Sequence, residues 1–337
     1  MTFKLQHDIL YNKKIRNERR YAKGCIAAAA YSCTNMSSKL QKLTTEMRNP
    51  RTLHIDRCET LKILQLMNQE DQTVPLAVAA QLDSIAQAVD AIVSRFKKGG
   101  RLYYVGSGTS GRLGVLDASE CAPTFGVDAQ QVQGILAGGM DAFQSAQEWL
   151  EDDEDAGAKV LDQYQVGSND VLVGITASGR TPFVLGAVTE AGKRGILTIG
   201  ISNSENSLLS QEVNIAITVP VGPEVVCGST RLKAGTAQKL ILNMLTTASM
   251  IRLGKVYENL MVDLKPTNYK LLERARSIIM EVTGVDRQTA ADTLEVAGMN
   301  VSVAILMLKL NCGAENARYL LDEHNGVIAQ ALREATK

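Results

Sequence analysis

The amino-acid sequence predicts an α/β fold: a doubly wound parallel sheet flanked by helices, followed by a small helical C-terminal domain. Short runs of β-branched and apolar residues alternate with helix-length segments between residues 101 and 253. These runs are apolar on both faces, which is typical of parallel strands that helices cover on either side. After Pro266 the strand-like runs stop, and helical spacing alone continues.

Two helices are expected before the sheet. Residues 59–70 have helical periodicity, and Pro75 begins a helix of about 75–98 that ends at Gly99-Gly100. Strands are then expected at 101–106, 133–138, 170–177, 196–202 and 214–220, with helices at 110–120, 140–150, 182–193 and 235–253. The C-terminal helices are expected at 269–282, 286–297, 301–310 and 313–333.

Composition narrows the class of function. The chain has 337 residues, 45% of them hydrophobic, and no formal net charge at pH 7. No basic field argues for a nucleic-acid partner, and no apolar run approaches the ~20 residues that a membrane helix needs. Six scattered cysteines and three histidines lack metal-like spacing, so we expect no metal site and free thiols in a reducing cytoplasm.

The sequence divides into three parts. Residues 1–38 are rich in lysine and arginine, and we expect either a disordered extension or a misassigned start, with Met36 as the real first residue. Residues 39–265 form the predicted α/β domain with its N-terminal helices. Residues 266–337 form the helical domain, and its segments TGVD and GMNVSVAI resemble the ubiquitin-associated type of three-helix unit.

Small hydroxyl residues follow four of the expected strands. They lie in GSGTSGR (106–112), ASGRTP (177–182), SNS (202–204) and the segment from Glu224 to Thr230. Ligands of a doubly wound sheet bind beyond the carboxyl ends of its strands, where helix N-terminal amides and hydroxyl groups form an anion site. One such loop is more often a tight turn with a serine cap, but four on one edge favour an anion site.

The surrounding residues restrict the kind of anion. Residues 106–111 match GxGxxG, but no acidic residue ends a strand near residue 126, as a dinucleotide site requires. The nucleotide-binding pattern GxxxxGK[ST] is absent, and no aspartate cluster suggests magnesium. A phosphate is therefore held without being transferred, which favours a small-molecule sugar phosphate and no cofactor.

Three kinds of side chain are candidates for the chemistry. Glu120 should lie at the end of its helix, because Pro123 is expected to break the helix just beyond it. Its apolar neighbours would favour the protonated form that a general acid needs. The run from Glu151 to Asp155 is expected to end the helix after the second strand, and most of its acids should face solvent. Lys233 and Lys239 either reach a phosphate or sugar hydroxyl or form a solvated helix start.

Four long segments together resemble one known family, the N-acetylmuramic acid 6-phosphate etherases. They are VGSGTSGRLGVLDASECAPTFG (105–126), ITASGRTPFV (175–184), GPEVVCGSTRLKAGTAQKLILNML (222–245) and GKVYENLMVDL (254–264). The resemblance extends over residues ~40 to 335. The glucokinase regulatory protein, a longer relative with the same sugar isomerase (SIS) fold, is not a catalyst.

The resemblance implies a reaction. A cofactor-free homodimer would cleave the lactyl ether of N-acetylmuramic acid 6-phosphate into N-acetylglucosamine 6-phosphate and D-lactate, by C2 deprotonation, lactate elimination and water addition. By position, Glu120 would protonate the departing lactate, and Glu151 is the candidate base. The residues that would bind the phosphate and sugar are Ser107, Gly108, Thr109, Ser110, Ser178, Gly179 and Thr181.

Two other functions stay open at this point. A sugar-phosphate isomerase of the same fold would share the C2 deprotonation but would have no leaving group. A sensor would bind a sugar phosphate and regulate a partner without catalysis. The chain length matches the enzyme, and both Glu120 and Glu151 are present, which a sensor would not need.

Overall fold

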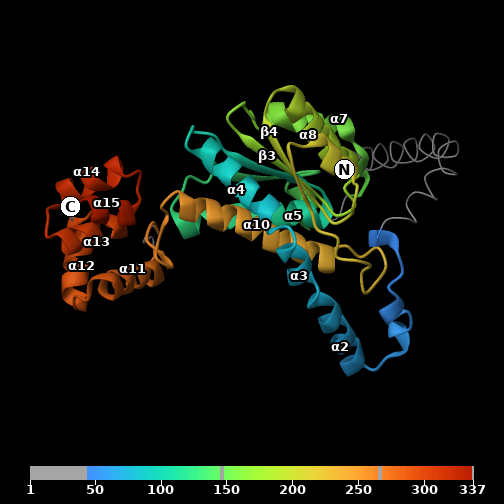
Figure 1. The fold of residues 1–337 in the computed structure, drawn as a ribbon, viewed down its shortest axis with the longest axis horizontal. Helices are drawn as coiled ribbons and strands as arrows, with labels where there is room; N and C mark the ends of the chain where they lie inside the picture. The colour runs from blue at the N-terminus through green and yellow to red at the C-terminus, as the bar shows by residue number, and fades with distance from the viewer. Residues whose placement is uncertain (1–43, 145–147, 265–267, 336–337) are drawn as a thin grey trace, which may run out of the picture.

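A computed structural model describes residues 44–144, 148–264 and 268–335 of the chain (Figure 1). The predicted extension, residues 1–38, lies outside the described residues. Within the described ranges, no single helix is long and apolar enough to cross a membrane. Two bent helix pairs, Thr60–Ala79 with Leu82–Phe96 and Arg287–Val296 with Val301–Leu310, meet the length and composition test jointly.

A five-stranded parallel sheet lies at the centre of the fold, as predicted. Its order is β2-β1-β3-β4-β5, and every neighbouring pair is parallel. The strands are β1 (Leu102–Gly106), β2 (Val132–Leu136), β3 (Val171–Thr176), β4 (Leu197–Ser202) and β5 (Ile215–Thr218). The chain moves from β1 outward to β2 and then returns to the other side of β1 for β3. The sheet therefore has its topological switch point between β1 and β3, where such folds bind ligands.

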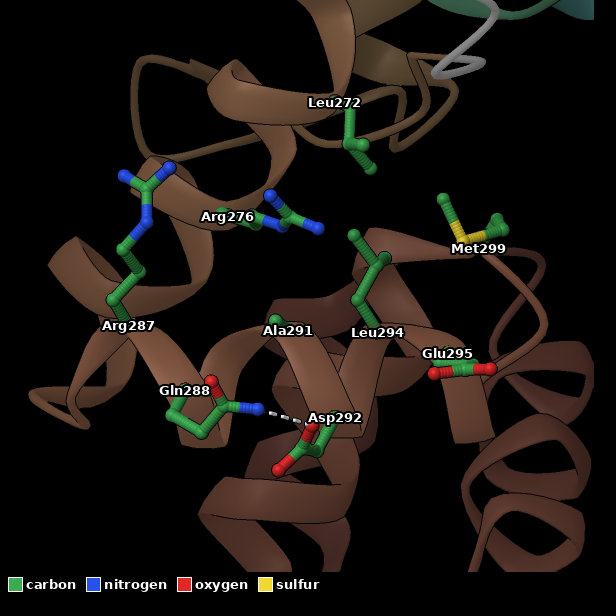
Figure 2. A pocket seen from close by; sticks show the side chains of 9 residues that line it. All are labelled: Leu272, Arg276, Arg287, Gln288, Ala291, Asp292, Leu294, Glu295 and Met299. Atoms are coloured by element: carbon green, nitrogen blue, oxygen red, sulfur yellow. Dashed lines mark hydrogen bonds between the residues drawn. The ribbon is translucent and has the colours of Figure 1, made fainter. Parts of the chain in front are cut away.

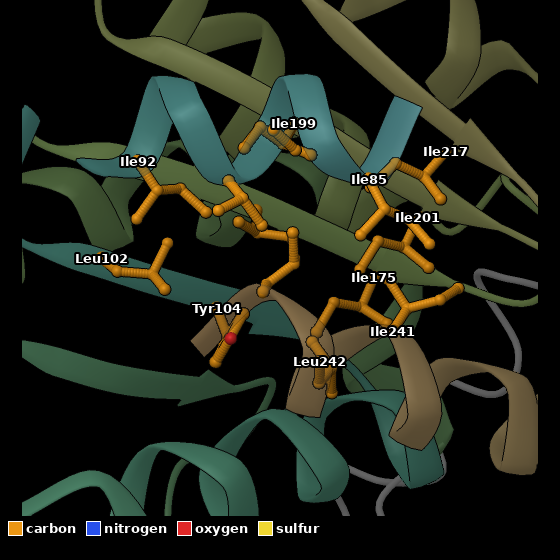
Figure 3. Close-up of a cluster of buried hydrophobic side chains, with 14 of the residues drawn as sticks. Ile85, Ile92, Leu102, Tyr104, Ile175, Ile199, Ile201, Ile217, Ile241 and Leu242 are labelled. Atoms are coloured by element: carbon orange, nitrogen blue, oxygen red, sulfur yellow. The ribbon is translucent and has the colours of Figure 1, made fainter. Parts of the chain in front are cut away.

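The two faces of the sheet bury separate hydrophobic clusters. Leu102 and Tyr104 of β1 face one cluster, and Tyr103 and Val105 face the other, because side chains alternate along a strand. The first cluster packs α3 (Val74–Ala79), α4 (Leu82–Phe96), α5 (Gly108–Phe125) and α10 (Lys233–Arg252) against the sheet; Figure 3 shows part of it. The second packs α7 (Glu154–Gln163), α8 (Pro182–Lys193) and α9 (Leu208–Glu212).

The N-terminal segment packs against the loop that precedes α10. It contains η1 (Thr44–Glu46), η2 (Pro50–Thr52), η3 (Ile55–Arg57) and α2 (Thr60–Asp71). The Asn49 side-chain amide donates to the Pro223 carbonyl at 3.3 Å, and the Thr52 hydroxyl donates to the Val225 carbonyl at 2.9 Å. These bonds tie together segments that are far apart in the sequence.

The C-terminal helices enclose a hydrophobic cluster of their own, which runs from Val262 to Ala331. The helices are α11 (Tyr269–Thr283), α12 (Arg287–Val296), α13 (Val301–Leu310), α14 (Ala314–Glu323) and α15 (Ile328–Ala335), gathered at one end of the molecule in Figure 1. A two-residue hairpin, β6 (Val256–Tyr257) with β7 (Leu260–Met261), precedes them.

Several predicted helix limits were wrong. The helix expected at 75–98 is two, α3 and α4, which meet at a bend of 59°. The helix expected at 313–333 is also two, because the chain turns at Asn325 and Gly326, both with positive φ. In place of the helix 140–150 there are α6 (Asp141–Gln144) and η4 (Glu148–Asp152), with residues 145–147 outside the described part.

Candidate active site

The loop after β1 has the geometry of an anion site. Ser107 is the N-cap residue of α5, but its side chain makes no capping hydrogen bond. The helix ladder begins when the Gly111 amide donates to the Ser107 carbonyl at 3.0 Å. The amides of Gly108, Thr109 and Ser110 therefore precede the ladder at the positive end of the α5 dipole. Such a helix start is suited to a phosphate.

Glycine is required where this loop doubles back on β1. A Cβ on Gly111 would lie 2.5 Å from the Gly106 carbonyl oxygen, and a Cβ on Gly106 would lie 2.7 Å from the Gly111 amide nitrogen. Any side chain at either position would separate the helix from the strand. The Thr109 methyl group packs toward α10, 3.5 Å from where a Cβ on Gly235 would stand.

The loop after β3 lies beside the first, because β1 and β3 pair with Gly106 opposite Ile175. The hydroxyls of Thr176 and Thr181 are 2.7 Å apart, and the Ser178 hydroxyl accepts a hydrogen bond from the Arg180 amide at 3.2 Å. Gly179 has a φ of +67°, and a Cβ there would lie 2.2 Å from the Ser207 Cβ. The two loops together form what we call the cradle, residues 107–110 and 178–181.

The other two hydroxyl-rich loops do not belong to the cradle, contrary to the expectation of four anion-binding loops. After β4, Asn203 is fully buried and donates to the Val219 carbonyl at 3.1 Å, so this loop supports the sheet edge. After β5, the Glu224 carboxylate accepts from the Lys233 and Ala234 amides at 2.9 and 3.0 Å. The Glu224 carboxylate thus occupies the N-terminus of α10, where a ligand anion would otherwise bind.

Glu151 lies at the cradle. It is part of η4, and its Oε1 is 3.1 Å from where a Cβ on Gly108 would stand. The Arg112 guanidinium holds the preceding segment by donating to the carbonyls of Phe143 and Ala142 at 2.9 and 2.7 Å. The prediction that the acidic run ends a helix of 140–150 was wrong. The run spans the end of η4 and the start of α7, and Asp153 caps α7 by accepting from the Ala156 amide at 2.8 Å.

Glu120 does not lie at the cradle within one chain. The prediction that Pro123 breaks the helix was wrong. α5 continues through Pro123 to Phe125 and ends at Gly126, whose φ is +66°. The buried side chains of Cys121 and Phe125 hold this last turn despite the bond that proline removes. Glu120 is ten residues beyond Ser110, or about 15 Å along the helix axis, toward the opposite edge of the sheet.

Glu120 opens onto a groove between α5 and α10. The groove has a volume of about 220 Å³ and is lined by Leu113, Leu116, Asp117, Glu120, Lys239, Leu242 and Asn243. Spacings of three and four residues place each set on one face of its helix. The sequence therefore contained a signal that could have grouped Lys239 with Glu120.

A buried hydrogen-bond network closes the groove from below. The Asp117 carboxylate accepts from the Tyr104 hydroxyl at 2.9 Å, the Asn243 amide at 2.6 Å and the Thr246 hydroxyl at 3.3 Å. Burial raises the pKa of Asp117, and burial raises the pKa of the Cys121 thiol to about 12. This network fixes α5 against α10 and so sets the position of Glu120.

Lys233 takes neither of the roles weighed from the sequence. Its side chain is 1% exposed, and its ammonium group donates to the Glu70 carboxylate at 2.8 Å. Arg51 donates to the same carboxylate at 2.8 Å. The Arg51 hydrogen bond is the main reason that the pKa of Glu70 is lowered to about 2, with a further contribution from Lys233. Lys233 therefore anchors α10 to α2.

Arg180 was missed by the sequence analysis. It lies between Ser178 and Thr181, and its Nε atom is buried with no hydrogen-bond partner among the described residues. An unpaired guanidinium N–H in an anion cradle is suited to a phosphate oxygen. Within the described part of the chain, no three His, Cys, Asp or Glu side chains cluster as metal ligands would.

A larger pocket lies in the C-terminal region, between α11 and α12 (Figure 2). Its volume is about 710 Å³, and Arg276 and Arg287 line it. Both arginines form ion pairs with Glu273, and two further acids, Asp292 and Glu295, line the pocket. The pocket is also remote in sequence from the strand ends, and we assign the site to the cradle and the groove.

Known proteins are similar to this chain over nearly its whole length. Models of the glucokinase regulatory protein N-terminal SIS domain and of the SIS domain match residues 84–192 and 151–248. An N-acetylmuramic acid 6-phosphate etherase from Pasteurella multocida is 54% identical, over 88% of this chain and 99% of that protein. The etherase from Oenococcus oeni is 51% identical, over 88% of this chain and 99% of its own. The etherase from Clostridium acetobutylicum is also 51% identical, over 90% of this chain and 100% of its own. A solved phosphoheptose isomerase from Francisella tularensis is 21% identical, with a TM-score of 0.45, over 58% of this chain and 100% of its own.

Proposed function

This chain belongs to the N-acetylmuramic acid 6-phosphate etherase family, and we propose that Glu120, Glu151 and the cradle carry out its reaction. The chain is an enzyme that cleaves the D-lactyl ether of N-acetylmuramic acid 6-phosphate, giving N-acetylglucosamine 6-phosphate and D-lactate. The observation that carries this function is the 54% identity across 99% of a relative of that name.

The chemistry needs an acid and a base. An unactivated ether resists hydrolysis, but opening of the sugar to its aldehyde makes the C2 proton acidic. A base removes that proton, the C3–oxygen bond breaks, and the departing lactate takes a proton from an acid. Water then adds to C3 and a proton returns to C2, so the net reaction consumes one water. Each acid or base group is typically worth about 10²- to 10⁴-fold in rate.

The cradle is proposed to hold the sugar phosphate through the residues 107–110, 178, 179 and 181. The first-turn amides of α5 and the hydroxyls of both loops supply hydrogen-bond donors for the phosphate oxygens. The Nε of Arg180, buried and without a hydrogen-bond partner in the described part of the chain, supports this assignment. Glu151 stands beside Gly108 at the rim of the cradle, where it can reach a sugar whose phosphate is bound there.

Glu120 is proposed to act on substrate held by the cradle of a second copy of the chain. About 15 Å along α5 separates Glu120 from Ser110, which is more than the span from the C6 phosphate to the C3 oxygen of one hexose. A homodimer resolves this if the groove of one protomer faces the cradle of its partner. Leu116, which lines the groove with Glu120, is 50% exposed, and a subunit interface at the groove would bury it.

Glu151 is proposed as the base at C2. Its carboxylate lies beside Gly108, at the N-terminus of α5, where the phosphate of the substrate is proposed to bind. A Glu151→Gln variant incubated with substrate in deuterated water should show neither lactate release nor exchange of the C2 proton. Exchange at the wild-type rate would assign the base to another residue.

The function is tested by incubating the protein with N-acetylmuramic acid 6-phosphate and assaying D-lactate. We expect stoichiometric D-lactate and N-acetylglucosamine 6-phosphate. The Glu120→Gln variant should lose about 10²- to 10⁴-fold in rate while still being inhibited by N-acetylglucosamine 6-phosphate. Binding without lactate release by the wild-type protein would refute the proposed reaction.

Two further assignments are proposed with this function. The α/β domain, residues 39–265, is proposed to carry the site, and residues 266–337 are proposed to form a separate helical domain. The hydrophobic cluster of the C-terminal helices supports a separate domain, but it also includes Val262 and Leu264, which precede residue 266. The protein is proposed to work in the cytoplasm, on phosphorylated sugar. Limited proteolysis between residues 264 and 268 that releases two folded fragments would support the domain division.

A further inference from the structure

We propose that the groove between α5 and α10 is the subsite for the lactyl group of the substrate, with Lys239 pairing with the lactyl carboxylate. The inference rests on the proposed role of Glu120 as the acid that protonates the ether oxygen. It adds a specificity-determining residue to that reaction. It also explains why the groove combines one cation with apolar walls.

The position of Glu120 fixes where the lactyl group must lie. An acid reaches the ether oxygen at a heavy-atom distance of about 2.6–3.2 Å. In a lactyl ether a single carbon joins that oxygen to both the methyl group and the carboxylate. The walls around Glu120 therefore contact these two groups, and the groove of about 220 Å³ has room for them.

The walls of the groove match the two groups in chemistry. Leu113 and Leu116 of α5 and Leu242 of α10 offer an apolar surface for the methyl group. Lys239 is the one lysine or arginine among the lining residues. A lactyl carboxylate is ionised at neutral pH, and an unpaired carboxylate against leucine side chains would be costly. A cation at Lys239 removes that cost.

Lys239 is available for an incoming anion. It is exposed, and among the described residues it forms neither a hydrogen bond nor an ion pair. Asp117, which interacts with Lys239 electrostatically, already accepts hydrogen bonds from Tyr104, Asn243 and Thr246. Because these donors occupy both oxygens of Asp117, that carboxylate is committed to the network beneath the groove. Lys239 is thus left as the charged donor at the groove surface.

The subsite predicts a specific change in substrate preference. The test compares N-acetylmuramic acid 6-phosphate with its analogue in which a carboxamide replaces the lactyl carboxylate. The wild-type enzyme should prefer the acid in kcat/KM by about 10- to 100-fold, the worth of a hydrogen bond between charged groups. Lys239→Met should lose that preference by slowing the acid alone, and Lys239→Arg should restore much of it.

The controls separate this inference from the proposed function. N-acetylglucosamine 6-phosphate lacks the lactyl group, so its inhibition constant should be the same in Lys239→Met and wild type. Lys193→Met, at an exposed lysine of α8 that is 3.8 Å from Glu190, should leave both substrates unaffected. Equal loss on acid and carboxamide, or no loss on either, would overturn the subsite while leaving the reaction intact. Absence of D-lactate with the wild-type enzyme would instead overturn the function.

Discussion

The buried ion pair between Glu70 and Lys233 should dominate the response of stability to a single substitution and to acid. Both side chains are nearly inaccessible, at 3% and 1% exposed, and Arg51 supplies a second cation. Glu70→Gln leaves the Lys233 ammonium group buried without its ion-pair partner. Removing one partner of a buried pair typically costs about 3–5 kcal/mol.

The lowered pKa of Glu70 gives an independent estimate. A fall from 4.5 to about 2 corresponds to about 3 kcal/mol of stability at neutral pH, at ~1.4 kcal/mol per pH unit. Because the pKa is lower in the folded chain, this stability is present above pH 4.5 and is lost as the pH falls toward 2. By about pH 3, roughly 2 kcal/mol of it should be gone.

Urea unfolding of the wild-type protein and Glu70→Gln, at one fixed protein concentration, measures both quantities. The difference in unfolding free energy should be about 3 kcal/mol at pH 7 and should shrink as the pH falls from 4.5 to 3. Asp162→Asn is the matched control: its exposed carboxylate also has a pKa lowered by an arginine, Arg194, but should change stability little. A difference for Glu70→Gln that stays constant over this range would refute the ion-pair argument.

Two further substitutions test the framework of the site by thermal or urea unfolding. Gly179→Ala should destabilise the protein by about 1–3 kcal/mol more than Gly195→Ala: both glycines have φ near +70°, but only Gly179 would press a Cβ against Ser207. Equal effects would show that backbone strain alone matters. Glu224→Ala should cost about 1–2 kcal/mol by removing the cap of α10, and no measurable cost would mean that water satisfies those amides.

The parts of the fold with local signals were predicted from the sequence. The helices α8 (Pro182–Lys193) and α13 (Val301–Leu310) lie where predicted, because a proline begins one and asparagines cap and end the other. The five strands were found because each is a short run dominated by apolar and β-branched residues. The cradle loops followed from glycine and serine placed directly after two of those strands.

The features that depend on distant partners were not predicted. Lys233 is buried because it pairs with Glu70, which is 163 positions away along the chain. The sequence around Lys233 contains no signal of that pairing. The run from Glu151 to Asp155 was expected to end a helix, whereas Asp153 within that run caps α7 by accepting from the Ala156 amide. The position of Glu120 is a different case: the rise of α5 separates it from Ser110 by about 15 Å, which the helix expected at 110–120 already implied.

The claim that Glu120 acts at the cradle of a partner subunit is tested most directly by subunit complementation. Glu120→Gln removes the acid, and Ser110→Asp places a negative charge in the first turn of α5, where the helix tolerates it but a phosphate is repelled. Each variant alone should be inactive. A heterodimer of the two, purified through a different tag on each chain, contains one intact composite site and should regain about half of the wild-type activity. A purified heterodimer as inactive as its parents, or the failure of any dimer to form, would contradict the account.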